Sequence, residues 1–351
     1  NPGAFNPDIV KVAAPIDPDV GMIAVRPVGE DKLSAVLAVF AMHLDTVGGT
    51  EYSADYPYFL ERELRKAFHP DVISLFGAGT CGDINHVDVT TRTRRTTEEL
   101  GTVLGRTAAA RLPGLETVAT PSLAARRAVL SLPLQSFPPE RIAAARAALK
   151  DVGSNTLSFL EQVEAVKIVD LADNYPEGKI DQEVQVFRLG PELAIVTLPG
   201  EVFVEHGLAI KKASPFATTL IVELMNDNPA YIPTLKAFSE GSYEIINSRL
   251  AAGSGEKLVE AAIGLLKELD AEARQETTAI EAAAMLMDIL KGSELGPNDG
   301  WFTIAAAQTR HDWAATSKRL DRNADNHVDR GEFPGTNDDY AVLDRDHDGE
   351  L

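Results

Sequence analysis

The order of apolar and polar positions along the first 270 residues predicts alternating strands and helices. Residues 33–43, 71–79 and 218–227 contain continuous apolar runs with the length of a buried strand. Residues 56–68 and 96–112 have apolar positions at helical spacing, and the second of these begins with a Thr-Thr-Glu-Glu cap signal. This succession predicts an α/β fold with a mixed sheet flanked by helices.

The same pattern continues to the end of this region. Residues 126–137 predict an edge strand followed by helices, and residues 182–203 predict two strands joined by a tight Gly-Pro-Glu turn. Residues 256–275 predict an amphipathic helix that runs into a second helical segment. We therefore expect an α/β domain over 1–270, a helical connector and linker over 271–300, and a small all-α module over 301–351.

Composition and charge narrow the class of protein. With 44% hydrophobic and 25% charged residues, the 351-residue chain is typical of a soluble globular protein, and no apolar run is long enough to span a membrane. The net charge of −20 argues against nucleic-acid binding and suits binding of divalent cations. Its single cysteine, Cys81, permits no intrachain disulfide and is expected to be a buried packing residue. Since the chain begins without Met and ends inside a motif, we expect it to be part of a longer protein.

The segment 321–332 has the spacing of a calcium-binding loop. Ca²⁺ takes six to eight oxygen ligands, and short oxygen-bearing side chains at alternate positions converge on one ion. Position 7 contributes a backbone carbonyl, so a histidine fits there, and a Glu at position 12 closes the site with two oxygens. Positions 1, 3, 5, 7, 9 and 12 are Asp321, Asn323, Asp325, His327, Asp329 and Glu332.

A second loop begins 23 residues later and is incomplete. Its oxygen-bearing positions are Asp344, Asp346, Asp348 and Glu350. The two loops together resemble a bacterial EF-hand pair, with Ca²⁺ as the expected ligand. The alternative is a solvated acidic tail.

Polar clusters follow four of the apolar runs in the larger region. In α/β sheets, ligands bind outside the carboxyl ends of the strands, so these clusters are expected to share one rim. They contain His43, then Asp83, Asn85, His86 and Asp88, then Glu201, and finally Asn226, Asp227, Asn228 and Tyr231. A His and a Glu together can ligate Zn²⁺ and leave a position for water.

Each candidate also has a simpler interpretation. A lone histidine at a strand end, as His43 is, is more often structural. Glu201 can cap the following helix, where a carboxylate is favourable, and Tyr231 can be a core residue. His86 is either an ordinary loop histidine or a hydrogen-bonding partner of the site, whereas His206 is expected on a helix surface.

Five motifs in order, "FAMH", "TCGDIN", "LPGE", "NDNPAYIPT" and "YE", resemble the neutral/alkaline non-lysosomal ceramidases and especially their bacterial relatives. The resemblance covers about residues 1–270 and implies zinc ligation by His43, Glu201 and Tyr231. It also implies that Tyr243 stabilises the oxyanion and that Asn85 lies beside the reacting amide. We expect Asp83 and His86 to lie around the ligands, with His86 hydrogen-bonding either a ligand or a carboxylate. In such enzymes, zinc activates a water molecule that attacks an amide carbonyl.

The chain departs from this family in three ways. The family's other zinc histidine belongs to an HxHSGP-like motif that this sequence lacks, so a missing N-terminal segment is an expected partner. Asn85 stands where ceramidases have Ser, and the EF-hand module replaces an immunoglobulin-like domain. Without the missing histidine the zinc site is incomplete, and the loss of the serine hydroxyl at Asn85 argues against ceramide as the substrate.

The resemblance implies a zinc-dependent hydrolase that cleaves an N-acyl bond of a lipid-like substrate outside the cytoplasm, in the periplasm or secreted. The alternatives are a non-catalytic calcium-binding scaffold, or a metal hydrolase that acts on another amide or an ester.

Overall fold

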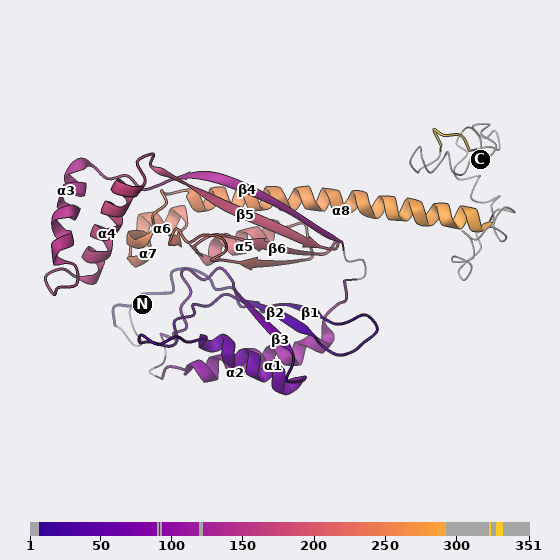
Figure 1. The fold of residues 1–351 in the computed structure, drawn as a ribbon, viewed down its shortest axis with the longest axis horizontal. Coiled ribbons are helices and arrows are strands. Elements are labelled where there is room, and N and C mark those ends of the chain that lie inside the picture. The colour runs from indigo at the N-terminus through magenta and orange to yellow at the C-terminus, as the bar shows by residue number, and fades with distance from the viewer. Residues whose placement is uncertain are drawn as a thin grey trace. The chain divides into compact units, whose positions relative to one another are not determined.

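The computed structural model describes residues 7–89, 91, 93–118, 122–292, 323 and 328–332. The chain divides into two compact units, Asn1–Asp270 and Ala271–Leu351. The first unit contains the α/β fold shown in Figure 1. Within the described residues, no helix is both long and apolar enough to cross a membrane.

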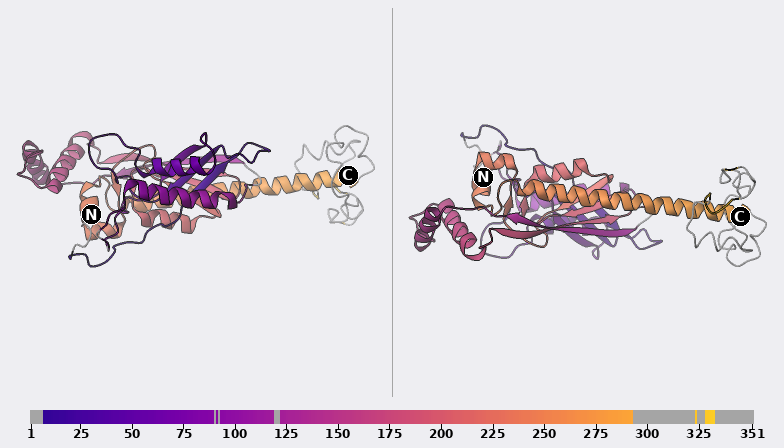
Figure 2. Two further views of the ribbon diagram at one scale, coloured as in Figure 1. Left: turned by 90° about the horizontal axis from the view of Figure 1, so that it is seen from below. Right: turned by 90° about the horizontal axis from the view of Figure 1, so that it is seen from above.

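The first sheet is formed by the N-terminal strands. Its order is β1-β2-β3, with β1 antiparallel and β3 parallel to β2. Helices α1 and α2 cover one of its faces, as the view from below in Figure 2 shows. The capping box of Thr96 and Glu99 opens α2, which confirms the cap signal in the sequence. The elements are β1 (Gly21–Val25), β2 (Ala35–Phe40), α1 (Asp55–Ala67), β3 (Ile73–Ala78) and α2 (Thr97–Arg111).

The second sheet has the order β4-β5-β6-β8. The first three strands are antiparallel neighbours, and β8 is parallel to β6. Strand β4 lies at the edge, and Gly190 at φ 77° lies in the tight β5–β6 turn, so both predictions for this region are confirmed. The elements are β4 (Leu123–Pro133), β5 (Lys179–Leu189), β6 (Leu193–Thr197), α5 (Val204–Ala213), β8 (Thr218–Val222) and α8 (Ser254–Gly292).

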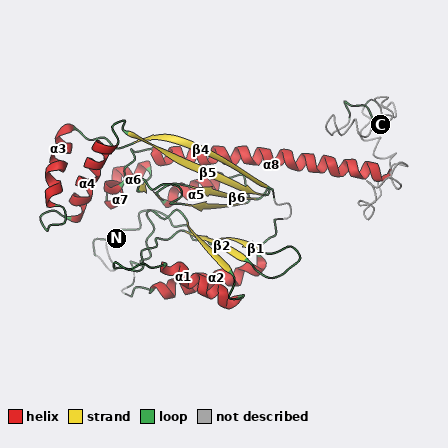
Figure 3. Ribbon diagram, viewed as in Figure 1, coloured by secondary structure: helices red, strands yellow, loops and turns green. Residues whose placement is uncertain are grey.

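Alternating residues of the strands show how the layers of the first unit pack. Val36 of β2 is buried against α1 and α2, whereas Val39, on the opposite face of the same strand, packs against Leu220 and Val222 of β8. The other face of the second sheet packs against α5 and the N-terminal part of α8. The two sheets therefore face each other between two helical layers (Figure 3).

The expectation of a single mixed sheet is thus wrong. A continuous apolar run predicts a strand that is buried on both faces, but it does not reveal which strands are hydrogen-bonded to it. The residues 256–292, predicted as two helical segments, belong to the single helix α8.

Smaller elements complete the first unit. Helices α3 and α4 form a hairpin inserted between β4 and β5, and β7 pairs with β9 in a short parallel sheet. These elements are η1 (Leu112–Gly114), α3 (Pro139–Ala148), η2 (Leu149–Asp151), α4 (Phe159–Asn174), β7 (Glu201–Val202), β9 (Tyr231–Ile232), α6 (Leu235–Glu240) and α7 (Tyr243–Asn247).

Candidate functional site

The loops that follow β2 and β3 are tied to each other. The backbone N–H of His43 donates to the carbonyl of Ile84 at 3.1 Å, and Gly79 donates to Phe40 at 2.9 Å. Because β2 and β3 are parallel, their carboxyl ends lie at the same edge of the sheet. His43 is therefore held beside the loop that carries Asp83.

The pairing of β7 with β9 brings in the other two candidates. Glu201 and Tyr231 are register partners, and the N–H of Glu201 donates to Ala230 at 3.1 Å. The loop after β3 approaches this pair closely, since the N–H of Gly82 donates to Val202 at 2.9 Å. A Cβ at Gly82 would lie 2.5 Å from the carbonyl oxygen of Glu201, so the position needs glycine.

The three expected zinc ligands meet around the carboxylate of Glu201. His43 Nε2 lies 3.4 Å from Glu201 Oε2, and the Tyr231 hydroxyl is near enough to the Glu201 carboxylate for that carboxylate to raise its pKa. The rings of His43 and Tyr231 are stacked, with an interplanar angle of 11° and centroids 6.3 Å apart. The side chains of His43 and Glu201 remain 20% and 24% exposed, so a small molecule can reach them.

Negative charge surrounds this site. Burial lowers the pKa of His43, but its hydrogen bond to Glu201 and the nearby charges of Asp45 and Glu223 act more strongly together, so the pKa is raised. Burial and the charge of Glu201 raise the pKa of the Tyr231 hydroxyl. A cation placed among these carboxylates would be stabilised.

Tyr243 lies next to the site as the resemblance implies. Its ring meets the ring of Tyr231 edge-on, with centroids 5.6 Å apart. Its hydroxyl accepts a hydrogen bond from Asn247 Nδ2 at 3.2 Å. Because a phenol both accepts and donates, this bond leaves the Tyr243 proton available to another acceptor.

The side chains of the "GDINH" loop have separate partners. Asp83 accepts a hydrogen bond from the N–H of Val204 at 2.8 Å, at the first residue of α5. It caps that helix from another loop, so the alternative that Glu201 is the cap is wrong. Burial raises the pKa of Asp83 to about 6. His86 Nδ1 pairs with Asp45 Oδ1 at 2.9 Å, and Asn85 is exposed.

Two further expectations concern buried residues. Cys81 is buried, which confirms its predicted packing role. His206 is only 4% exposed, so its predicted place on the helix surface is wrong. A Cβ at Gly255 would lie 2.3 Å from His206 Nε2, which shows that the N-terminus of α8 covers the imidazole.

Glu223 is the residue of this region that the sequence interpretation missed. It follows β8, is 2% exposed, and accepts hydrogen bonds from the N–H of Val202 at 2.7 Å and of Cys81 at 3.2 Å. Cys81 Sγ donates to its other oxygen at 3.0 Å. Burial raises the pKa of Glu223 to about 8. A carboxylate at the end of a buried apolar run was the available signal.

The backbone after Glu223 is strained. Leu224, Asn226 and Ala230 have φ values of 59°, 69° and 66°, in the left-handed region that favours glycine. Such conformations cost about 1–3 kcal/mol each and cluster at functional sites. The strained loop connects β8 to Tyr231.

The donor set fits zinc in chemistry and in the spacing of one pair. Two ligands at about 2.0–2.2 Å from a tetrahedral zinc ion lie about 3.3–3.5 Å apart. The His43–Glu201 separation of 3.4 Å falls in that interval. In the part of the chain that the structure describes, no three His, Cys, Asp or Glu side chains are grouped to hold a metal, so Tyr231 is needed as the third donor. His43 Nδ1 is buried and has no hydrogen-bond partner among the described residues.

Among the described residues of the predicted first calcium loop, two backbone N–H groups contact the carboxylate of Glu332. Its carboxylate accepts hydrogen bonds from the N–H groups of Asn323 at 2.9 Å and Asp329 at 3.4 Å. Position 12 thus contacts the backbone of positions 3 and 9. The remaining calcium candidates lie outside the described residues: Asp321, Asp325, His327, Asp344, Asp346, Asp348 and Glu350.

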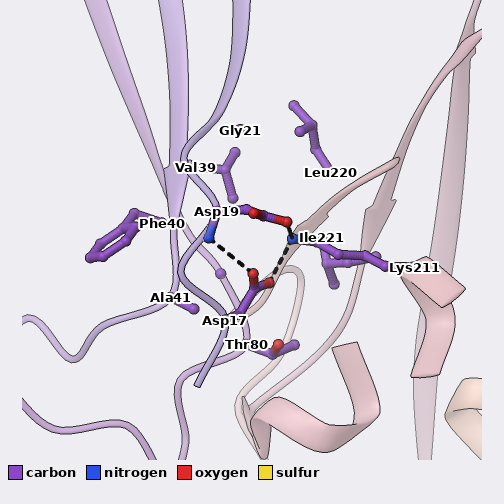
Figure 4. A pocket seen from close by; sticks show the side chains of 11 residues that line it. Asp17, Asp19, Gly21, Val39, Phe40, Ala41, Thr80, Lys211, Leu220 and Ile221 are labelled. Carbon is purple, nitrogen blue, oxygen red and sulfur yellow. Dashed lines mark hydrogen bonds and ion pairs between the residues drawn. The ribbon is translucent and has the colours of Figure 1, made fainter. Parts of the chain in front are cut away.

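A small hollow next to β2 contains a separate charge cluster (Figure 4). Lys211 Nζ lies 2.6 Å from Asp17 Oδ2 and 3.7 Å from Asp19 Oδ2. The hollow has a volume of about 10 Å³, which is room for about one water molecule at most. This cluster ties the N-terminal segment to α5 and offers no space for a substrate.

Comparison with known proteins finds solved structures of similar fold. No protein-family model and no curated protein matches the chain. A solved structure of the neutral ceramidase from Pseudomonas aeruginosa is similar, with a TM-score of 0.52 and 16% identity over 75% of this chain and 49% of that chain. The structure described as "Ceramidase complexed with C2" has a TM-score of 0.51 and 16% identity over 75% of this chain and 50% of that one.

The fold is ceramidase-like. The chain spans about half the length of these ceramidases. At this level of identity, the likeness concerns the fold alone.

Proposed function

We propose that this chain is a ceramidase-like hydrolase that uses a zinc ion, held by His43, Glu201 and Tyr231, to cleave the N-acyl bond of a lipid-like amide. The observation that carries the proposal is the 3.4 Å approach of His43 Nε2 to Glu201 Oε2, with Tyr231 stacked on His43 and paired in register with Glu201. These groups come from three separated segments of a ceramidase-like fold.

The chain's own residues have distinct roles in this proposal. When bound, zinc would act as a Lewis acid and lower the pKa of a water molecule. Tyr243, whose hydroxyl proton is available, donates a hydrogen bond to the oxyanion that develops on the amide carbonyl. Asn85, exposed on the loop after β3, contacts the polar part of the substrate. Glu223 and Gly82 keep that loop against β7, so that Glu201 stays beside His43.

A calcium loop closed by Glu332 accompanies this site in the proposal. Calcium loops of micromolar to millimolar affinity suit a location outside the cytoplasm, in the periplasm or secreted. The hydrogen bonds from the N–H groups of Asn323 and Asp329 to Glu332 support the loop assignment, because they bring positions 3, 9 and 12 together.

Metal analysis tests the ligand assignment. We expect one zinc per chain in the purified protein after zinc loading, and loss of that zinc in His43→Ala and Glu201→Gln. His69→Gln is the matched control, because His69 Nε2 bonds the Leu33 carbonyl at 2.6 Å, outside the site. Stoichiometric zinc in both site variants would contradict the assignment. Turnover of a panel of N-acyl lipids, simple amides and esters then identifies the substrate class.

One observation favours a second candidate, a non-catalytic scaffold with a degenerate site. His43 Nε2 and Glu201 already contact each other, and the described residues contain no group of three His, Cys, Asp or Glu side chains that could hold a metal ion. A protein of this kind would bind calcium but neither zinc nor N-acyl lipids. The same metal analysis therefore separates the two candidates.

A further inference from the structure

Aromatic rings form a continuous row that leads from the protein surface to Glu201. The ring of Phe159 is stacked on Tyr243 with centroids 6.1 Å apart and an interplanar angle of 26°. Tyr243 meets Tyr231 at 5.6 Å, and Tyr231 meets His43 at 6.3 Å. All three separations lie in the range of direct aromatic contact, about 4.5–7 Å.

Exposure falls along this row from Phe159 to Tyr231. Phe159 is 67% exposed, Tyr243 is partly buried, and Tyr231 is 7% exposed. Phe159 is the first residue of α4, and the capping box of Ser158 with Glu161 fixes the start of that helix. The helix start and the contact with Tyr243 therefore position the Phe159 ring, although solvent surrounds much of it. Leaving a large apolar ring in water forgoes the free energy of burial.

The row is apolar except at the hydroxyl groups of its two tyrosines. The Tyr231 hydroxyl lies near Glu201, and the Tyr243 hydroxyl accepts a hydrogen bond from Asn247 while its proton stays available to a polar group of the substrate. Along the rest of its length, the row offers a ligand ring faces and edges, which are apolar. Its inner end offers the polar groups of Glu201 and His43. The complementary molecule has an apolar chain with a polar group at one end.

We propose that Phe159 and Tyr243 bind the apolar acyl chain of the substrate, and that Phe159 determines specificity for chain length. The choice of an acyl amide rests on the function proposed above. The claim of chain binding is separate, because it requires contact with the rings and no bond cleavage.

Equilibrium binding tests this claim without turnover. The probes are N-acyl ethanolamides with acyl chains of two, four, six and eight carbons, at concentrations below micelle formation, and the measurement is titration calorimetry. Each methylene that the rings cover contributes up to about fourfold in affinity, the equivalent of about 0.8 kcal/mol. We expect wild-type affinity to rise with chain length.

Variants at two exposed positions of α4 give the comparison. We expect Phe159→Ala to weaken binding of the eight-carbon probe by about 3- to 10-fold and to leave the two-carbon probe unchanged. Phe159→Leu, which keeps an apolar side chain, should restore part of the loss. Val166→Ala is the control, because Val166 is 48% exposed on the same helix and has no place in the row.

Three results would overturn the proposal. One is the same dependence on chain length in wild type and Phe159→Ala. Another is binding of phosphatidylcholine vesicles without binding of any monomeric probe. The last is a dimer in size-exclusion chromatography that Phe159→Ala dissociates, because the ring would then cover a second copy.

Failure of this inference can be distinguished from failure of the proposed function. Chain-length selectivity without hydrolysis would contradict only the hydrolase assignment. Hydrolysis without dependence on Phe159 would contradict only this inference.

Discussion

The candidate zinc site and the candidate calcium loop are built in opposite ways. The candidate calcium loop is a single stretch of twelve residues, 321–332, and each of its ligand positions is predicted from the spacing in the sequence. The zinc candidates His43, Glu201 and Tyr231 come from three segments far apart in the chain, and they meet because strands end at a common place. A local site can be found by its motif, whereas a dispersed site depends on the residues that hold its segments together.

Removing the buried carboxyl of Glu223 should break the dispersed site most severely. Glu223→Ala leaves the N–H groups of Val202 and Cys81 without their acceptor and creates a cavity. We expect a loss of about 3–5 kcal/mol in the free energy of unfolding, measured by urea denaturation. Glu223→Gln, which keeps an acceptor oxygen, is the matched control. A loss below about 1 kcal/mol in the alanine variant would show that the hydrogen bonds of Glu223 contribute little to stability.

The local site should respond to a single change that leaves the rest of the chain intact. Glu332→Gln removes one negative charge and bidentate ligation at position 12. We expect the affinity for calcium to fall about 10- to 100-fold in a calorimetric titration, with zinc content unchanged. An isotherm identical to wild type would remove Glu332 from the calcium site.

The pH dependence of stability should distinguish a protonated Glu223 from a charged one. Its pKa of about 8 in the folded protein exceeds the unfolded value of about 4.3. The folded protein therefore binds more protons between these values, and stability falls as the pH rises from about 4.5 to 8.

The contribution of this one carboxyl is at most about 1.4 kcal/mol per pH unit. Urea midpoints of the metal-free protein between pH 5 and 8 measure it. Glu223→Gln should flatten the profile relative to wild type, and parallel profiles would exclude Glu223 as the titrating group.

The smallest expected effect belongs to Asp83, which caps α5 from the loop after β3. Asp83→Ala should lower the free energy of unfolding by about 1 kcal/mol, the usual cost of a lost helix cap. Thermal denaturation measures this loss, with Asp83→Asn as the variant that keeps an acceptor. A large loss of bound zinc in Asp83→Ala without loss of stability would instead assign Asp83 to the metal site.

Much of the fold was predictable because its signals are local. The Thr96–Glu99 capping box, the tight turn at Gly190 and the apolar runs of β2 and β3 each occupy a short stretch of sequence. The division into two facing sheets was not predictable, because an apolar run looks the same whichever strand it pairs with.

The candidate site divides in the same way. The polar clusters at the ends of apolar runs indicated His43, Glu201 and Tyr231, and the structure brings them together. The role of Glu223 depends on burial and on donors from distant loops, and Asp83 was assigned to the ligands rather than to the cap of α5. Such partners are fixed by tertiary packing, which spacing in the sequence does not encode.

Locating zinc directly tests the central claim that these three residues form one metal site. Crystals of the zinc-loaded protein, measured on both sides of the zinc absorption edge, give the position of the ion by anomalous scattering. The account predicts a peak about 2.0–2.2 Å from both His43 Nε2 and Glu201 Oε2, with the Tyr231 hydroxyl as a third ligand. Zinc found only elsewhere on the protein, with His43 and Glu201 still in contact, would contradict it.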